Sequence, residues 1–95
     1  MRLSLSQAQA IRTAVARQDP AARVILFGSR ADDQARGGDI DLLVISESIG
    51  LRDEWRIRRD ILDEIGWQKL DLVVARPNAL DSGIARLALA SGVSL

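Results

Sequence analysis

The stretch RVILFGSRADDQARGGDIDLLVI, residues 23–45, decides how this chain folds. Its apolar run at 23–27 contains β-branched residues and predicts a buried strand, which the glycine at position 28 ends. Residues 29–35 suit one or two helical turns, with acidic residues near the start, where the helix dipole favours them. A Gly-Gly loop follows, and residues 40–45 predict a second strand. The whole unit therefore predicts a strand, a tight turn, a short helix, a loop and a strand.

Beyond this unit, the chain shows helical and strand periodicity with clear end signals. Ser4 or Ser6 can cap a first helix that runs to about Gln18, and Pro20 lies just beyond its end. Further helices are predicted at 51–65 and 80–90, a strand at 70–75 and a short edge strand at 93–95. The order αβαβαβα, with that final strand, predicts an α/β (α+β) fold in which helices pack on a small sheet.

Apolar residues on each predicted helix fall on one stripe, which predicts the face that packs on the sheet. We expect Trp55 and Trp67 to serve core or interface packing, and Leu89 to point off the stripe of the last helix. The stripes consist of Ala8, Ile11 and Val15 on the first helix, Leu51, Trp55, Ile61, Leu62 and Ile65 on the second, and Leu80, Ile84, Leu87 and Ala88 on the last.

The composition limits the kinds of protein that this chain can be. Its 95 residues suffice for one small domain, which we assign to residues 1–95. The 13 basic and 13 acidic residues balance, which gives no overall attraction to nucleic acid or to a membrane surface. Cysteine and histidine are both absent, so a bound metal must be held by oxygen ligands, which favours magnesium or manganese. No stretch is long enough to span a bilayer, and we expect a cytoplasmic location.

Three aspartates can meet at one end of the predicted sheet. Asp39 and Asp41 are two residues apart and therefore point to the same side of their strand. Asp71 lies one residue into the strand at 70–75 and would join them if the two strands are neighbours, since cross-strand Cβ atoms are roughly 5 Å apart. Clustered carboxylates repel unless a cation lies between them, and such a set suits two magnesium ions. The alternating residues Ile40, Leu42 and Val44 should face the core.

The turn after the first strand is suited to phosphate. Gly28 has no Cβ, so a phosphate group can approach the backbone closely. A helix that begins at Ser29 would offer free N–H groups, and the Ser29 hydroxyl could bond a β- or γ-phosphate oxygen. Arg30 could add charge-assisted contacts to the same phosphates. With the aspartates, this turn predicts a site for a metal-bound nucleoside triphosphate.

Each of these features also has an ordinary structural explanation. A Gly-Ser pair is commonly a strand-to-helix turn with a cap, and acidic residues often begin strands at a solvated edge. Arg30 alone is most often a surface charge. The combination of all these residues at this spacing favours the functional interpretation.

The motifs resemble those of the nucleotidyltransferase superfamily that includes DNA polymerase beta. The resemblance is carried by Gly28-Ser29-Arg30, by GDIDLLV at 38–44 and by LDLVV at 70–74, and it covers nearly the whole chain. More closely, the chain resembles the minimal nucleotidyltransferases, which consist of little beyond the catalytic core.

This resemblance implies a small mixed sheet flanked by helices and a metal-dependent transfer of AMP from ATP. It implies that Asp39, Asp41 and Asp71 bind Mg²⁺ or Mn²⁺ and that Gly28 and Ser29 hold the triphosphate. Many relatives are encoded beside a small helical HEPN-domain protein and act as the antitoxin of the pair by transferring AMP onto the toxin. The implied partner is therefore a HEPN-domain protein.

The chain departs from the family pattern at two places. Gly38 stands where relatives often carry a serine, and Asp32 and Asp33 stand where many carry a basic residue. Two exposed acids beside a phosphate site should weaken anion binding by about 0.5–1 kcal/mol each at low salt. Arg36 could offset them.

Two other functions are consistent with the sequence. The chain could be a binding module that neutralises a partner toxin by occlusion. The off-stripe Leu89, the small size of the domain and the acidic turn at Asp32-Asp33 suggest this alternative. It could instead modify a small molecule or an RNA end, although the balanced charge argues against nucleic acid.

The apolar residues that continue the carboxylate side of the two strands need a cover. A helix of this chain or a second copy in a homo-oligomer could supply it. These residues are Leu43, Ile45, Val73 and Ala75.

Overall fold

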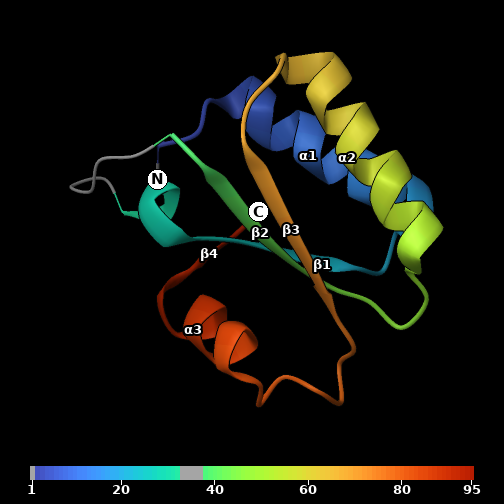
Figure 1. The fold of residues 1–95 in the computed structure, drawn as a ribbon, viewed down its shortest axis with the longest axis vertical. Coiled ribbons are helices and arrows are strands. Elements are labelled where there is room, and N and C mark those ends of the chain that lie inside the picture. The colour runs from blue at the N-terminus through green and yellow to red at the C-terminus, as the bar shows by residue number, and fades with distance from the viewer. Residues whose placement is uncertain (1, 33–37) are drawn as a thin grey trace.

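The computed structural model describes residues 2–32 and 38–95 (Figure 1). Most predicted bounds are confirmed, including both long helices and all four strands. The elements are α1 (Leu5–Gln18), β1 (Arg23–Phe27), the 3₁₀ turn η1 (Gly28–Ala31), β2 (Ile40–Ile45), α2 (Leu51–Ile65), β3 (Leu70–Ala75), α3 (Gly83–Ser91) and β4 (Val93–Ser94).

The short helix predicted at 29–35 is longer than the helical turn that the structure shows. The structure has a 3₁₀ helix of four residues, and Asp32 after it is already extended. Residues 33–35 lie outside the described residues, as does Arg36. A 3₁₀ turn of this length aligns few peptide dipoles, so its positive end is weaker than that of a full helix.

The sheet is mixed, with the strand order β3-β2-β1-β4. Strand β1 pairs antiparallel with β2 and with β4, and β2 pairs parallel with β3. Figure 1 shows α1 and α2 packed together on one face of the sheet and α3 on the other face. The fold is therefore the predicted small α+β fold, and β3 and β4 form the two edges of its sheet.

The main core lies between the sheet and the pair α1 and α2. Ile11 of α1 and Ile57 of α2 are fully buried, and they pack in one cluster with alternate residues of the strands. The predicted core-facing row of β2 is confirmed, because Ile40, Leu42 and Val44 all belong to this cluster.

Helix α3 covers the other face of the sheet with small residues. Ala85 and Ala88 are buried against Ile25, Leu43 and Ile45. A helix of this chain therefore supplies the cover that these strand residues require.

The predicted stripe of this last helix is largely wrong. The helix begins at Gly83 and leaves Ile84 and Leu87 exposed. Alanines allow a close approach, and at Gly92 an added Cβ would lie 2.4 Å from Ile25 Cγ2. Close packing of small residues thus outweighs burial of the larger ones.

The predicted stripe of helix α2 is only partly confirmed. Ile61 is buried and Leu62 and Ile65 pack against the main core, but the start of the stripe is exposed. Ile57 and Ile61 are buried, whereas the side chains of Leu51 and Trp55 are 75% and 70% exposed. Trp67 is 85% exposed, so neither tryptophan belongs to the core, and their role in interface packing stays a prediction. Both sides of this helix carry apolar residues, and periodicity could not choose between them.

This difference gives a stability prediction. We expect Ile57→Ala to lower the free energy of unfolding by about 2–5 kcal/mol, because it removes a fully buried side chain from the main core. Trp55→Ala, on the exposed side of the same helix, should change it by less than about 0.5 kcal/mol. Urea unfolding followed by circular dichroism measures both, and equal losses in the two variants would contradict the assignment of faces.

Candidate active site

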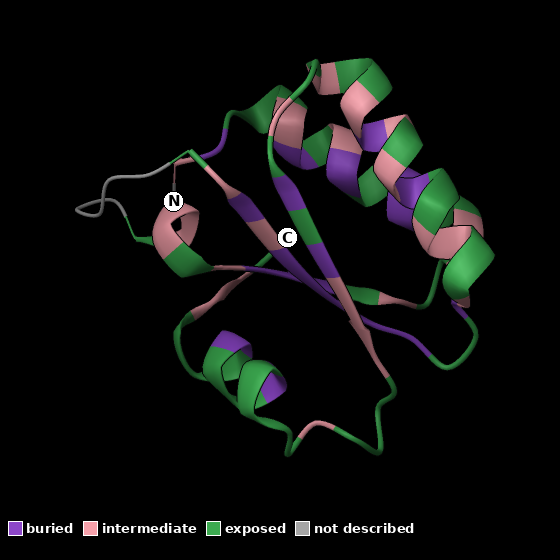
Figure 2. Ribbon diagram, viewed as in Figure 1, coloured by how far each residue is buried: buried purple, intermediate pink, exposed green. Residues whose placement is uncertain are grey.

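The structure brings Asp41 and Asp71 together. Asp41 of β2 and Asp71 of β3 are directly paired in the parallel register, so their side chains leave the sheet on the same face. That face is the one that α3 covers farther along, where Leu43 and Ile45 lie. Figure 2 shows the alternation on β3, with exposed Asp71 between the buried residues Leu70 and Leu72. Asp71 thus lies open to solvent on an edge strand.

The electrostatics of Asp41 show that the acids repel one another. Partial burial raises the pKa of the Asp41 carboxyl, and a hydrogen bond with Asp71 and the negative charges of Asp71 and Asp39 raise it further. The positive charge of Lys69 acts in the opposite direction. These carboxylates therefore need a cation between them to ionise together at low cost.

Asp39 interacts with a basic side chain that sequence reasoning missed. Lys69 Nζ lies 3.5 Å from Asp39 Oδ2, at the start of the same two strands. Within residues 2–32 and 38–95, no three His, Cys, Asp or Glu side chains form a ready metal-binding group. The alternation of Lys69 and Asp71 along one strand could have revealed this lysine.

The Gly28 turn lies against the acids. Gly28 has a φ of 71° and follows Phe27, which pairs with Asp41 across the antiparallel strands. A Cβ at this position would lie 2.3 Å from Asp41 Oδ2. Both the left-handed backbone and the carboxylate therefore require glycine here. The Ser29 hydroxyl, next in the turn, has no hydrogen-bond partner in the part of the chain that the structure describes.

Arg30 braces the site in this structure. Its guanidinium donates to the Arg2 carbonyl at 2.9 Å, to the Gly38 carbonyl at 3.0 Å and to Gln68 Oε1 at 3.0 Å. These bonds tie the N-terminal segment, the residue before Asp39 and the loop before β3 to the turn. Its Nε is buried and has no hydrogen-bond partner among residues 2–32 and 38–95. The role of Arg30 as a phosphate ligand stays a prediction.

Arg2 also holds the turn in place through hydrogen bonds, and no feature of the sequence indicated this role. Its guanidinium donates to the Ser29 carbonyl at 3.1 Å and to the Asp32 carbonyl at 3.4 Å. Its backbone N–H donates to the Arg30 carbonyl at 2.7 Å. The two arginines together fix the position of the Gly28-Ser29 turn.

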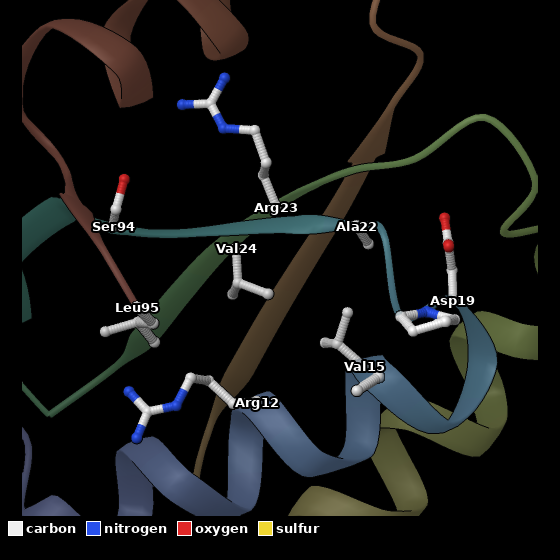
Figure 3. Close-up of a pocket in the computed structure, with 10 residues that line it drawn as sticks. Arg12, Val15, Asp19, Ala22, Arg23, Val24, Ser94 and Leu95 are labelled. Carbon is white, nitrogen blue, oxygen red and sulfur yellow. The ribbon is translucent and has the colours of Figure 1, made fainter.

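A cavity of about 290 Å³ lies elsewhere in the molecule and contains none of the predicted site residues. Figure 3 shows it between α1 and the β1–β4 edge, where Arg12, Val24 and Leu95 line it and Arg23 points away on the other side of the sheet. Arg23 pairs with Ile45, at the far end of the strand pair from Asp41. The candidate site is therefore the open sheet end around the aspartates.

The aspartate oxygens at the start of β2 and β3 are the kind of ligand that a hard divalent cation prefers. Asp41 and Asp71 supply oxygen ligands on adjacent strands, and their mutual repulsion is what a cation relieves. Asp39 could join them once its carboxylate leaves Lys69. Asp41 and Asp71 are thus placed to bind a metal together, whereas Asp39 is ion-paired with Lys69 in this structure.

The raised pKa of Asp41 gives a pH-dependent prediction for the metal-free protein. A carboxyl whose pKa is raised by folding contributes stability below its unfolded pKa and loses it as the pH rises through the folded pKa. Asparagine imitates the protonated form. In EDTA, Asp41→Asn should therefore be more stable than wild type at neutral pH, and the difference should shrink towards pH 4. Urea titrations across this range measure it, and a variant less stable than wild type at pH 7 would contradict the electrostatic account.

Comparison with known protein families finds a match that covers most of the chain. The sequence model of the family described as "Polymerase beta, Nucleotidyltransferase" matches residues 9–95. No curated protein shows significant similarity to the chain. None of the helices in the described ranges is long and apolar enough to cross a membrane.

Proposed function

Because the chain belongs to the polymerase beta nucleotidyltransferase family, we propose that it transfers AMP from ATP to a hydroxyl group of a partner protein. The observation that carries this proposal is the direct pairing of Asp41 with Asp71, with the Gly28 turn pressed against the Asp41 carboxylate. This arrangement puts paired acids beside a backbone that phosphate can approach.

The proposed reaction assigns a role to each side chain. Asp41, Asp71 and Asp39 hold the divalent metal, which supplies charge neutralisation at the phosphates when bound. The Gly28 and Ser29 turn binds the β- and γ-phosphates, and Arg2 and Arg30 keep that turn in place. Asp71, the exposed acid on the edge strand, accepts the proton of the acceptor hydroxyl.

The bonds and charges in this transfer balance. The acceptor oxygen forms a bond to the α-phosphorus, and the bond between the α-phosphorus and the bridging oxygen breaks. Pyrophosphate leaves with that oxygen, and the hydroxyl proton goes to the carboxylate. The products are an AMP ester of the acceptor and pyrophosphate.

A protein acceptor is supported by the openness of the site. Asp71 lies on an edge strand, so a large acceptor can reach it without entering a cavity. The family resemblance favours a HEPN-domain toxin, with this chain as the antitoxin of the pair.

The direct test mixes the purified protein with the product of the neighbouring gene, ATP and Mg²⁺. Intact-mass spectrometry should show one or more gains of a nucleotide monophosphate on the acceptor. GTP, CTP and UTP in parallel identify the base. The absence of any gain with all four nucleotides and a HEPN-domain partner would contradict the proposal.

Neutralisation by occlusion is a second candidate, and the ion pair between Asp39 and Lys69 favours it. An acid paired with a lysine must give up that ion pair before it can bind a metal. The double variant Asp39→Asn, Asp41→Asn separates the two functions in cells that express the toxin. Protection by the folded variant supports occlusion, and loss of protection supports catalysis.

A further inference from the structure

The outward side of α2 carries a groove that the fold does not use. Its volume is about 470 Å³, and Figure 2 shows exposed residues along this side of the helix. The lining comes from α2 alone and consists of Arg52, Trp55, Arg56, Arg58, Arg59 and Leu62. Residues 52, 55, 56 and 59 are spaced as one helix face, which is the surface that a second helix packs against.

The groove is lined mainly by basic residues. Four of the six lining residues are arginines, and none is acidic. The Arg52 side chain has no hydrogen bond or ion pair with any described residue. The acids near the other arginines satisfy them only partly: Asp53 lies 3.5 Å from Arg56, and Asp60 is shared between Arg59 and Arg17. The lining of the groove is thus rich in arginine, although the whole chain has no net charge.

Large apolar side chains lie among these charges. Trp55 is 70% exposed, and Leu51, which lines the adjoining hollow, is 75% exposed. Neither contributes to the two core clusters. Tryptophan and arginine are the residue types that contribute most to binding at protein interfaces.

The residues that line the groove indicate which kind of partner could bind there. A second copy bound through the same face would set arginines against arginines, since a two-fold interface pairs a surface with itself. Nucleic acid would suit the arginines, but the leucines beside Trp55 suit apolar side chains instead. An acidic partner with an apolar centre matches both the charges and the exposed side chains.

We propose that the groove on α2 docks an amphipathic helix of a partner protein, with Asp or Glu residues on both sides of an apolar row. The apolar row packs on Trp55 and Leu62, and the acids pair with Arg52, Arg56 and Arg59. Arg58 connects this surface to the site, because its guanidinium donates to the carbonyl of Leu70, the residue before Asp71. A partner held here would lie near the strand that carries Asp71, on the opposite side of the sheet from the acids.

This inference goes beyond the proposed function and does not depend on it. The groove lies on the α1–α2 side of the sheet, whereas the acids lie on the α3 side. Docking can be measured without nucleotide or metal, so a failure of docking and a failure of transfer are separate results.

The test uses a displayed library of helical peptides selected against the full chain at low salt. We expect the selected peptides to be enriched in Asp and Glu on both sides of an apolar row. Fluorescence anisotropy of the labelled consensus peptide should show binding about tenfold or more weaker in Trp55→Ala and in Arg56→Glu. Replacing the facing acid of the peptide by lysine should restore binding to Arg56→Glu, and added salt should weaken binding to wild type.

Matched controls come from exposed residues of the same types elsewhere. Trp67→Ala and Arg12→Glu should leave the affinity unchanged within about twofold. Peptides without acidic enrichment, or peptides that bind equally well to Trp55→Ala, would overturn the proposal. So would preferential binding of a single-stranded oligonucleotide, or self-association in sedimentation that Trp55→Ala abolishes.

Discussion

Replacing Asp71 by asparagine is expected to lower the rate of nucleotide transfer by about 10²–10⁴-fold, the usual contribution of a general base. Asparagine keeps the shape of the side chain but cannot take the proton of the acceptor hydroxyl. Asp71 is exposed on the edge strand, so its replacement should leave the fold intact. Pyrophosphate release in the presence of the acceptor protein measures the rate, and circular dichroism verifies folding.

The control for this variant is Asp81→Asn, an exposed aspartate in the turn before α3. It should transfer nucleotide at the wild-type rate. If the Asp71→Asn protein is folded and as active as this control, Asp71 does not take part in the reaction.

Replacing Gly28 by alanine should impair both folding and transfer. The added Cβ would lie 2.3 Å from Asp41 Oδ2, in a backbone conformation with a φ of 71° that alanine adopts at a cost. We expect a loss of about 1–3 kcal/mol in the free energy of unfolding. The carboxylate must shift to make room, and a displacement of about 1 Å at a reacting centre can cost about 10²-fold in rate.

Gly38→Ala is the matched control, because an added Cβ there meets nothing within 4 Å. It should change stability by less than about 0.5 kcal/mol and leave the rate near that of wild type. The contact between Gly28 and Asp41 would be contradicted if the two alanine variants had the same stability and the same activity.

The strands and α2 could be predicted from the sequence because their signals are local. Strand β1 and helix α2 are each followed by a glycine, and the bounds at 40–45, 51–65 and 70–75 match the structure. The spacing of Asp39, Asp41 and Asp71 also indicated a common edge, and the parallel register places Asp41 beside Asp71.

Packing choices between similar faces could not be predicted. Helix α2 carries apolar residues on two sides, and only the sheet determines that Ile57 is buried and Trp55 exposed. Helix α3 packs through alanines, which carry a weak signal beside Ile84 and Leu87. The contacts of Arg2 join residues far apart in the chain, so no local pattern contains them, whereas the alternation of Lys69 and Asp71 was a local signal that could have indicated the lysine.

The central claim is that Asp41 and Asp71 hold the metal of the bound nucleotide beside the Gly28 turn. Anomalous diffraction from crystals grown with Mn²⁺ and a non-hydrolysable ATP analogue tests it most directly. We predict a manganese peak between the carboxylates of Asp41 and Asp71, with the triphosphate against Gly28 and Ser29 and Asp39 released from Lys69. Manganese and nucleotide bound away from both aspartates would contradict the claim.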